Sequence, residues 1–214
     1  MIKKYKAIIF DLDGTLLDTI KDIAYSANFV LKKHNFRTHS VNRYKLFVGD
    51  GIDTLVNRIL PRDKKCDKFV QDIIKEIKVE YARNWARNTK VYPGILDLLI
   101  KLQDKKVKIS VLSNKPDRFT KLMVRHFFPK IRFSFIFGVK KGFPKKPEPT
   151  VALRIAKKLK IAAKDFVYLG DTKTDMQTAN RAGMLSVGVL WGFRTKNELI
   201  KSGAKMLIKK PNEL

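Results

Sequence analysis

The sequence predicts an α/β fold with a parallel sheet between two layers of helices, and a helical domain inserted into the chain. Short apolar segments rich in β-branched and aromatic residues alternate with amphipathic helical segments, which is typical of βαβ units. Polar residues follow several of the apolar segments, as ligand-binding residues do at the ends of parallel strands. The stretch 16–89 breaks the alternation and predicts the insertion.

Five segments have the composition of short buried strands, because they are apolar and end at glycine or polar residues. They are YKAIIFD (5–11), VKISVLS (107–113), FSFIFG (133–138), DFVYLG (165–170) and SVGVLW (186–191). Helical patterns separate them at 95–106, 116–127, 149–160 and 174–182. Pro116 and Pro149 suit a first helical turn, and Gly183 suits a helix C-terminus. This order predicts a Rossmann-like three-layer core.

The insertion carries two apolar stripes at helical spacing, one near residues 20–31 and one near 69–81. We therefore expect an α/β core domain formed by residues 1–15 and 90–214. Residues 16–89 are expected to form a helical cap domain.

The composition excludes several classes of protein. Hydrophobic residues make up 44% of the 214 residues, which is enough for a packed core. Cys66 is the single cysteine, so no internal disulfide can form and a cytoplasmic location is expected. The apolar run after the basic N-terminus is too short for a secretory signal, and no run is long enough to span a membrane.

The formal net charge of +26 arises from 46 Lys and Arg against 20 Asp and Glu. A nucleic acid or an anionic membrane is one interpretation of such a charge. However, the basic residues are scattered through every segment, with no long basic arm and no nucleic-acid-binding motif. We therefore interpret them as a solvated lysine-rich surface and expect neither a nucleic-acid nor a membrane partner.

Aspartates gather at two predicted strand ends. In FDLDGT, Asp11 and Asp13 lie two residues apart on an extended chain, so they point the same way before Gly14 turns the chain. In YLGDTKTDM, Asp171 follows a strand, and Asp175 lies about one helical turn further on. Carboxylates this close repel unless a cation lies between them, and Mg²⁺ prefers such oxygen ligands.

Two further signals fit an anion. VLSNKP places Ser113 and Asn114 at a predicted helix start, where hydroxyl and backbone N–H groups can bind a phosphate. An ordinary N-cap explains that segment equally well. FPKKPEP holds Lys145 and Lys146 between prolines, although a lysine pair alone means little in so basic a chain.

Taken together and in this order, the four signals resemble the four motifs of the haloacid dehalogenase-like (HAD) superfamily, and the resemblance covers essentially the whole chain. Within the superfamily, segments such as FVGDGIDTLVNRIL, VYPGILDLLIKL and KKPEP follow the layout of the phosphoglycolate phosphatase-like group. Related pyrophosphatases and sugar-phosphate enzymes share much of this layout.

The resemblance implies a Mg²⁺-dependent phosphatase, a phosphoric monoester hydrolase acting on a small phosphorylated metabolite. It implies that Asp11 is the nucleophile that forms an aspartyl-phosphate, and that Asp13 is the acid and base. The implied metal ligands are Asp11, Asp13 (through its carbonyl), Asp171 and Asp175. Ser113, Asn114 and Gly14 are the implied substrate-binding residues, and Lys146, rather than Lys145, is the implied catalytic cation.

Alternatives remain open at this point. Dehalogenases of the superfamily lack the second aspartate, so Asp13 favours phosphoryl transfer. Among enzymes of phosphoryl transfer, five alternatives stay open. They are a phosphoglycolate-like phosphatase, an inorganic pyrophosphatase, a nucleotidase, a sugar-phosphate phosphatase and a phosphomutase. A nucleic-acid-binding protein on the same fold is the rival from another class. Oligomeric state is open between monomer and homodimer.

Overall fold

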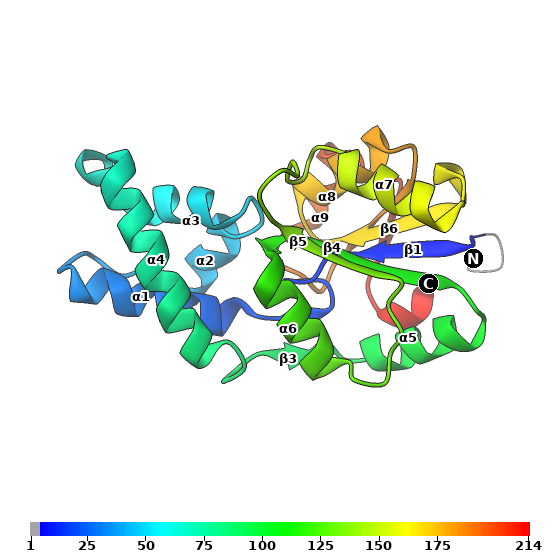
Figure 1. Cartoon of the computed structure of the whole chain (residues 1–214), viewed down its shortest axis with the longest axis horizontal. Coiled ribbons are helices and arrows are strands. Elements are labelled where there is room, and N and C mark those ends of the chain that lie inside the picture. The colour runs from blue at the N-terminus through cyan, green and yellow to red at the C-terminus, as the bar shows by residue number, and fades with distance from the viewer. Residues whose placement is uncertain (1–4) are drawn as a thin grey trace. The chain divides into compact units, whose positions relative to one another are not determined.

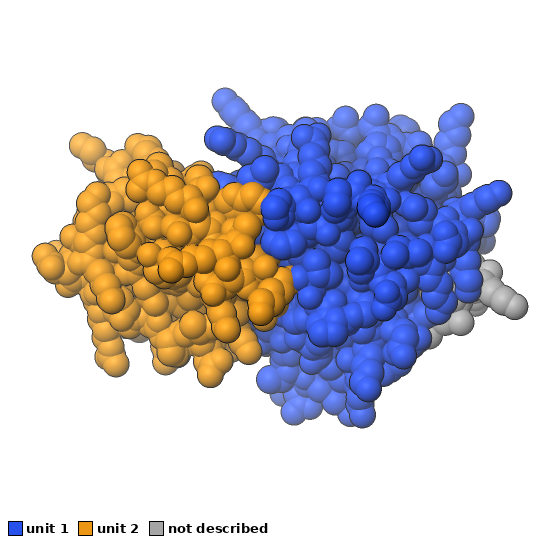
Figure 2. Space-filling model, turned by 90° about the horizontal axis from the view of Figure 1, so that it is seen from below, with its two compact units in different colours: residues 1–17, 91–214 blue, residues 18–90 orange. Residues whose placement is uncertain are grey.

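The computed structural model describes residues 5–214, which fall into two compact units (Figures 1 and 2). Unit 1 consists of residues 1–17 and 91–214, of which 1–4 lie outside the described residues. Unit 2 consists of residues 18–90. The chain therefore leaves unit 1 once, forms unit 2, and returns.

Unit 1 is built on a six-stranded sheet whose strand order is β5-β4-β1-β6-β7-β8 and whose neighbouring strands are all parallel. The strands are β1 (Ala7–Phe10), β4 (Lys108–Pro116), β5 (Phe135–Val139), β6 (Phe166–Gly170), β7 (Leu185–Val189) and β8 (Met206–Ile208). The five predicted strands are confirmed. The three-residue edge strand β8 was not predicted, because so short a segment in a basic tail carries no pattern of its own.

The helices of unit 1 lie on both faces of this sheet (Figure 1). They are α5 (Ile95–Asp104), α6 (Asp117–Phe127), α7 (Thr150–Leu159), α8 (Lys173–Arg181) and α9 (Lys196–Lys201), with short 3₁₀ helices at Ala163–Asp165 and Pro211–Glu213. Ala7 and Ile9 of β1 pack in one apolar cluster with Ile155 of α7 and Ala179 of α8. Figure 1 shows α5 and α6 on the opposite face. The predicted three-layer core is thus confirmed, and it explains why β1 is apolar at every position.

Strand register brings the polar residues of the motifs to one edge of the sheet. Phe10, the last residue of β1, pairs with Val111 of β4 on one side and Leu169 of β6 on the other. Because parallel strands end at the same edge, Asp11 and Asp171 leave neighbouring strands side by side. The sequence expectation of a ligand site at strand ends therefore has a structural basis.

Two predicted helix starts are wrong, because each helix begins one residue after the proline that was predicted to start it. Strand β4 continues through Pro116 and α6 begins at Asp117, so Ser113 and Asn114 lie on an extended strand instead of at a helix start. Similarly, Pro149 is the residue before α7 and not its first residue.

Unit 2 is helical, with α1 (Ile20–Lys33), α2 (Val41–Phe47), α3 (Ile52–Ile59), a short 3₁₀ helix (Arg62–Lys64) and α4 (Asp67–Asn84). The apolar stripes of α1 and α4 are buried, and these two helices pack against each other. Two-residue strands, β2 (Leu17–Asp18) and β3 (Lys90–Val91), pair where the chain passes between the units. Within residues 5–214, no helix has the length and apolar content needed to cross a membrane.

Candidate active site

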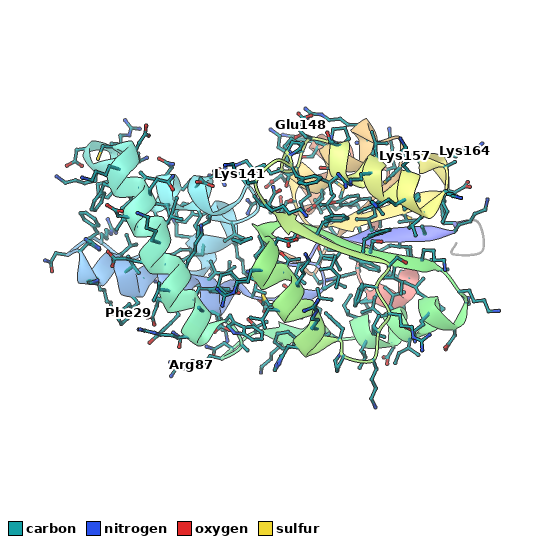
Figure 3. The ribbon with its side chains drawn as sticks, viewed as in Figure 1. Phe29, Arg87, Lys141, Glu148, Lys157 and Lys164 are labelled. Atoms are coloured by element: carbon teal, nitrogen blue, oxygen red, sulfur yellow. The ribbon has the colours of Figure 1, made fainter. Side chains whose placement is uncertain are left out.

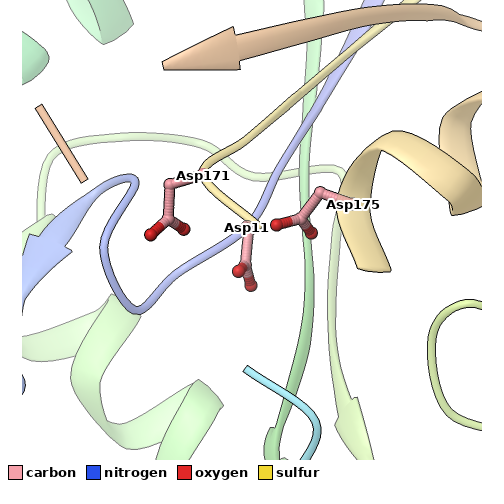
Figure 4. Close-up of side chains that lie close together, drawn as sticks. All are labelled: Asp11, Asp171 and Asp175. Atoms are coloured by element: carbon pink, nitrogen blue, oxygen red, sulfur yellow. The ribbon is translucent and has the colours of Figure 1, made fainter. Parts of the chain in front are cut away.

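Three aspartates form a buried carboxylate cluster in unit 1. One carboxylate oxygen from each of Asp11, Asp171 and Asp175 lies within 4.8 Å of the others. Figure 4 shows the three side chains next to one another, with Asp11 after β1, Asp171 after β6 and Asp175 in the first turn of α8. Residues 160 positions apart in the chain thus converge because β1 and β6 are neighbours.

Hydrogen bonds fix the orientation of two of these carboxylates. Asp171 accepts from Thr15 Oγ1 at 3.2 Å and from the backbone N–H of Phe193 at 2.7 Å. Asp175 Oδ2 accepts from the backbone N–H of Thr172 at 3.0 Å and from its hydroxyl at 2.6 Å, in a capping box at the start of α8. The same interaction therefore caps α8 and orients the Asp175 carboxylate.

Lys146 is the cation of the cluster. Its Nζ lies 2.9 Å from Asp11 Oδ1 and 2.7 Å from Asp175 Oδ1, and its side chain is 1% exposed. The amide of Asn114 holds the backbone of Lys146 on both sides, accepting from its N–H at 2.9 Å and donating to its carbonyl at 3.1 Å. Asn114 thus lies behind Lys146 and positions it. Lys145, the neighbouring candidate, is exposed.

The charges in this cluster shift pKa values strongly. Burial, helped by the Asp175 carboxylate and opposed by Lys146, raises the pKa of Asp11 to about 7. Burial and the carboxylates of Asp175 and Asp11 raise the pKa of Asp171 well above its usual range. Burial lowers the pKa of Lys146, but the two carboxylates outweigh burial and raise that pKa well above its ordinary value. Lys146 alone therefore does not compensate the negative charge of the three carboxylates.

The donor set fits a divalent cation. When all three carboxylates are ionised, their three negative charges exceed the single positive charge of Lys146, so negative charge remains inside a buried site. Hard carboxylate oxygens are the ligands that Mg²⁺ and Ca²⁺ prefer. Asp11 Oδ1 accepts from the backbone N–H of Leu12 and pairs with Lys146, while Oδ2 has no donor within residues 5–214.

Two glycines allow this close packing. Gly14 has a φ of +83°, and a Cβ at that position would collide with the carboxylate of Asp171. A Cβ on Gly192 would collide with Asp171 from the other side and would lie 2.5 Å from the carbonyl oxygen of Gly14. The absence of a side chain at Gly14 therefore leaves room for the Asp171 carboxylate in the site.

Asp13, Ser113 and Lys115 form a second group beside the cluster. Both carboxylate oxygens of Asp13 accept from Lys115 Nζ, at 3.0 and 3.1 Å. Ser113 lies buried near the end of β4, and its hydroxyl oxygen accepts from the backbone N–H of Lys115 at 3.2 Å. The Asp13 carboxylate thus belongs to an ion pair of its own, outside the three-aspartate cluster.

Sequence reasoning missed Lys115 and the loop after β7. The signal for Lys115 was available: on an extended strand, residues two apart face the same side, so Lys115 shares the side of Ser113. The prediction of a helix start at this position concealed it. Nothing in the sequence indicated that Phe193 would donate its N–H to Asp171 or that Trp191 Nε1 would donate to the carbonyl of Thr15 at 3.0 Å.

In unit 2, an ion pair joins α3 to the loop before it. Arg58 Nη2 lies 2.6 Å from Asp50 Oδ2, and its Nη1 donates to the Phe47 carbonyl at 2.9 Å. Arg43 stacks over the Phe47 ring at 5.7 Å. Both arginines are thus held by neighbours in their own unit.

Comparison with known proteins agrees with this geometry. A family model described as haloacid dehalogenase-like hydrolase matches residues 8–189, which include every aspartate of the site. The chain belongs to the haloacid dehalogenase-like hydrolase family. Within that family it falls in the phosphoglycolate phosphatase-like group, and as its member it is a phosphoric monoester hydrolase.

The relatives of this hydrolase match most of this chain and at least three quarters of their own length. A phosphoglycolate phosphatase from Aquifex aeolicus is 31% identical over 195 residues, which are 91% of this chain and 89% of the relative. A crystal structure of a proposed phosphoglycolate phosphatase from Lactobacillus delbrueckii subsp. bulgaricus has a TM-score of 0.92 and 32% identity, and covers 98% of this chain and 96% of its own. A β-phosphoglucomutase from Clostridium difficile has a TM-score of 0.77 at 23% identity, covering 98% and 93%, and shares the fold.

Proposed function

We propose that this hydrolase is a Mg²⁺-dependent phosphatase that transfers the phosphoryl group of a small phosphorylated metabolite to Asp11 and then to water. The observation that carries the proposal is the buried cluster of Asp11, Asp171 and Asp175, with Lys146 bridging two of the three. An anionic phosphoryl group can approach such carboxylates only when cations offset their charge.

In this proposal Asp11 attacks phosphorus through Oδ2 and forms an aspartyl-phosphate, while the leaving oxygen takes a proton from Asp13. Lys146 favours the ionised form of Asp11 and orients it, because its Nζ holds Oδ1 at 2.9 Å. In the second step water attacks the same phosphorus and gives a proton to Asp13, the bond between phosphorus and Asp11 Oδ2 breaks, and inorganic phosphate leaves the regenerated Asp11 carboxylate. Ser113 has a hydroxyl hydrogen available for a phosphoryl oxygen, because its oxygen accepts from Lys115.

Asp11, Asp171, Asp175 and the Asp13 carbonyl are the proposed ligands of Mg²⁺. A bound divalent cation supplies neutralisation of charge on the nucleophile and on the phosphoryl oxygens. Gly14 and Phe193 serve this site indirectly, since Gly14 leaves room for Asp171 and Phe193 donates to it. Unit 2 is proposed to act as the cap that excludes water while substrate is bound.

A phosphoglycolate-like substrate is proposed because relatives named phosphoglycolate phosphatase match 88% or more of the chain. Sugar phosphates stay alternatives. The likeness to the β-phosphoglucomutase, at 23% identity, concerns the fold alone and does not favour a mutase.

The first test replaces the nucleophile. Wild-type protein with Mg²⁺ is expected to release phosphate from p-nitrophenyl phosphate and from 2-phosphoglycolate. Asp11→Asn removes the attacking carboxylate while keeping the shape of the side chain, and we expect at least a thousandfold loss of kcat. Unchanged thermal unfolding would show that the variant is folded. Asp18→Asn, an aspartate outside the cluster, is the matched control and should retain activity.

The second test concerns the metal without using activity. Mg²⁺ binding to the folded protein should raise the melting temperature of metal-stripped wild type in proportion to the logarithm of its concentration. Asp171→Asn removes one ligand charge and should weaken this dependence at least tenfold in apparent affinity. A wild type whose unfolding ignores Mg²⁺, Mn²⁺ and Ca²⁺ alike would contradict the proposed metal site.

A further inference from the structure

The indole of Trp191 has no role in the mechanism proposed above, although it contacts the turn that follows the nucleophile. Its Nε1–H donates to the backbone carbonyl of Thr15 at 3.0 Å. Thr15 lies between β1 and β2, whereas Trp191 lies in the loop between β7 and α9, 176 positions further along the chain. A side chain that joins two such distant loops beside a charged site fixes their relative position.

This contact closes a ring of hydrogen bonds around the Asp171 carboxylate. Thr15 Oγ1 donates to Asp171 Oδ1 at 3.2 Å, and the backbone N–H of Phe193 donates to Asp171 Oδ2 at 2.7 Å. Trp191 and Phe193 belong to the same loop, and Gly192 between them has no side chain that would collide with Asp171. The indole therefore links the two groups that hold the two oxygens of Asp171.

Electrostatic repulsion acts against this arrangement. One carboxylate oxygen from each of Asp11, Asp171 and Asp175 lies within 4.8 Å of the others, and like charges this close repel one another strongly in a buried site. Before a cation binds, the repulsion favours movement of Asp171 away from the other two. A carboxylate that has to be brought back lowers the affinity for the cation, whereas one that is already in place does not.

We infer that Trp191 is a positioning residue of the metal site, which holds Asp171 through Thr15 in the geometry that binds Mg²⁺ before the ion arrives. This inference rests on the proposed function, because Asp171 is one of its proposed ligands. Groups that directly support a metal ligand change metal affinity about 10–100-fold when they are replaced. Trp191 acts through Thr15, one contact further from the ion, so its effect is smaller.

Trp191→Phe tests the inference, because it keeps an aromatic ring and removes the N–H. The affinity for Mg²⁺, measured by the rise of the melting temperature of metal-stripped protein, should fall about twofold to tenfold, the effect of one neutral hydrogen bond. Phosphatase activity lost at limiting Mg²⁺ should recover as Mg²⁺ is raised. Trp85→Phe changes the other tryptophan, which lies in unit 2, and should keep the affinity of wild type.

Thr15→Val adds a measurement that a purely structural role of Trp191 would not affect. It removes the hydroxyl that donates to Asp171 and keeps the carbonyl that accepts from Trp191. Thr15→Val alone should weaken Mg²⁺ binding. If Trp191 acts through Thr15, adding Trp191→Phe to this variant should lower the affinity by less than it does in wild type. Fully additive losses would contradict the inference.

The remaining outcomes separate the inference from the proposed function. A Trp191→Phe protein that melts earlier without metal but binds Mg²⁺ as wild type does would show that the indole only stabilises the fold. Equal losses of affinity in Trp191→Phe and Trp85→Phe overturn the inference as well. Where Trp191→Phe does not fold, a Thr15→Val protein with wild-type affinity overturns it. A wild type that binds no divalent cation overturns the proposed metal site itself.

Discussion

Lys146 and Lys145 are adjacent in sequence but lie in opposite environments. Lys146 is 3% exposed and pairs with Asp11 and Asp175, whereas Lys145 is exposed. Removing one partner of a buried ion pair leaves uncompensated charge and costs about 3–5 kcal/mol in typical proteins. The pair of lysines therefore provides an experiment with its control one residue away.

Lys146→Met is expected to reduce kcat at least a hundredfold and to lower the free energy of unfolding in metal-free buffer. Lys145→Met should change kcat less than twofold and the free energy of unfolding by less than about 0.5 kcal/mol. Phosphate release and urea denaturation measure the two effects. Equal losses in both variants would mean that the charge of the segment matters and that the geometry of Lys146 does not.

At the residue scale, the sequence located the carboxylates better than the residues that support them. Asp11 and Asp171 follow from the rule that polar groups at the ends of neighbouring parallel strands converge, and Asp175 follows from its place about one helical turn further on. The pairing of Asp13 with Lys115 depends on β4 extending to Pro116, which apolar pattern alone does not define. A backbone donor such as the N–H of Phe193 cannot be predicted from the type of side chain, because every residue except proline has this group.

At the scale of elements, helix α8 connects folding to the site. Its capping box joins Thr172 to Asp175, the aspartate that also pairs with Lys146. The helical pattern over 174–182 does not by itself decide whether Asp171 or Thr172 caps the helix, because aspartate and threonine are both good N-cap residues. The capping box decides between them: Thr172 caps, which frees Asp171 to reach the cluster.

Thr172→Ala should therefore have a double effect. Loss of the hydroxyl should lower the free energy of unfolding by about 1–2 kcal/mol. Asp175 Oδ2 would keep only the backbone N–H of residue 172 as a donor, so Asp175 should be held less firmly and phosphatase activity should fall. Thr172→Ser keeps the hydroxyl and should stay close to wild type in both measurements. A Thr172→Ala protein that loses stability and keeps full activity would indicate that Lys146 and the backbone N–H of residue 172 suffice to orient Asp175.

At the scale of the whole molecule, the charge of +26 is borne mainly by exposed side chains such as Lys141, Lys157 and Lys164, which extend from separate parts of unit 1 (Figure 3). Like charges on a compact surface repel, and folding brings them closer together. Raising the NaCl concentration from 10 to 150 mM shortens the screening length from about 30 to about 8 Å.

The melting temperature should accordingly rise by several degrees between these salt concentrations, in metal-free buffer without phosphate. Differential scanning fluorimetry measures it, and KCl should reproduce the effect if screening is the cause. A melting temperature that falls with salt would show instead that attractive ion pairs, such as Lys6 with Asp165, outweigh the repulsion.

The overall architecture was the most predictable level. Alternating strands and helices define a parallel sheet with helices on both faces, because right-handed crossovers leave few other arrangements. The helical character of the insertion followed from its apolar stripes. The strands that were not predicted are short: β8 has three residues, and β2 and β3 have two each.

The pairing of β2 with β3 has a consequence for how this architecture can change. Neighbouring strands run about 4.8 Å apart, so the chain departs from and rejoins the sheet-bearing unit at practically the same point. A tight turn of a few residues would bridge that gap. Shortening or exchanging the 18–90 segment would therefore leave the order of the strands in the large sheet unchanged, and Asp11, Asp171 and Asp175 all lie outside that segment.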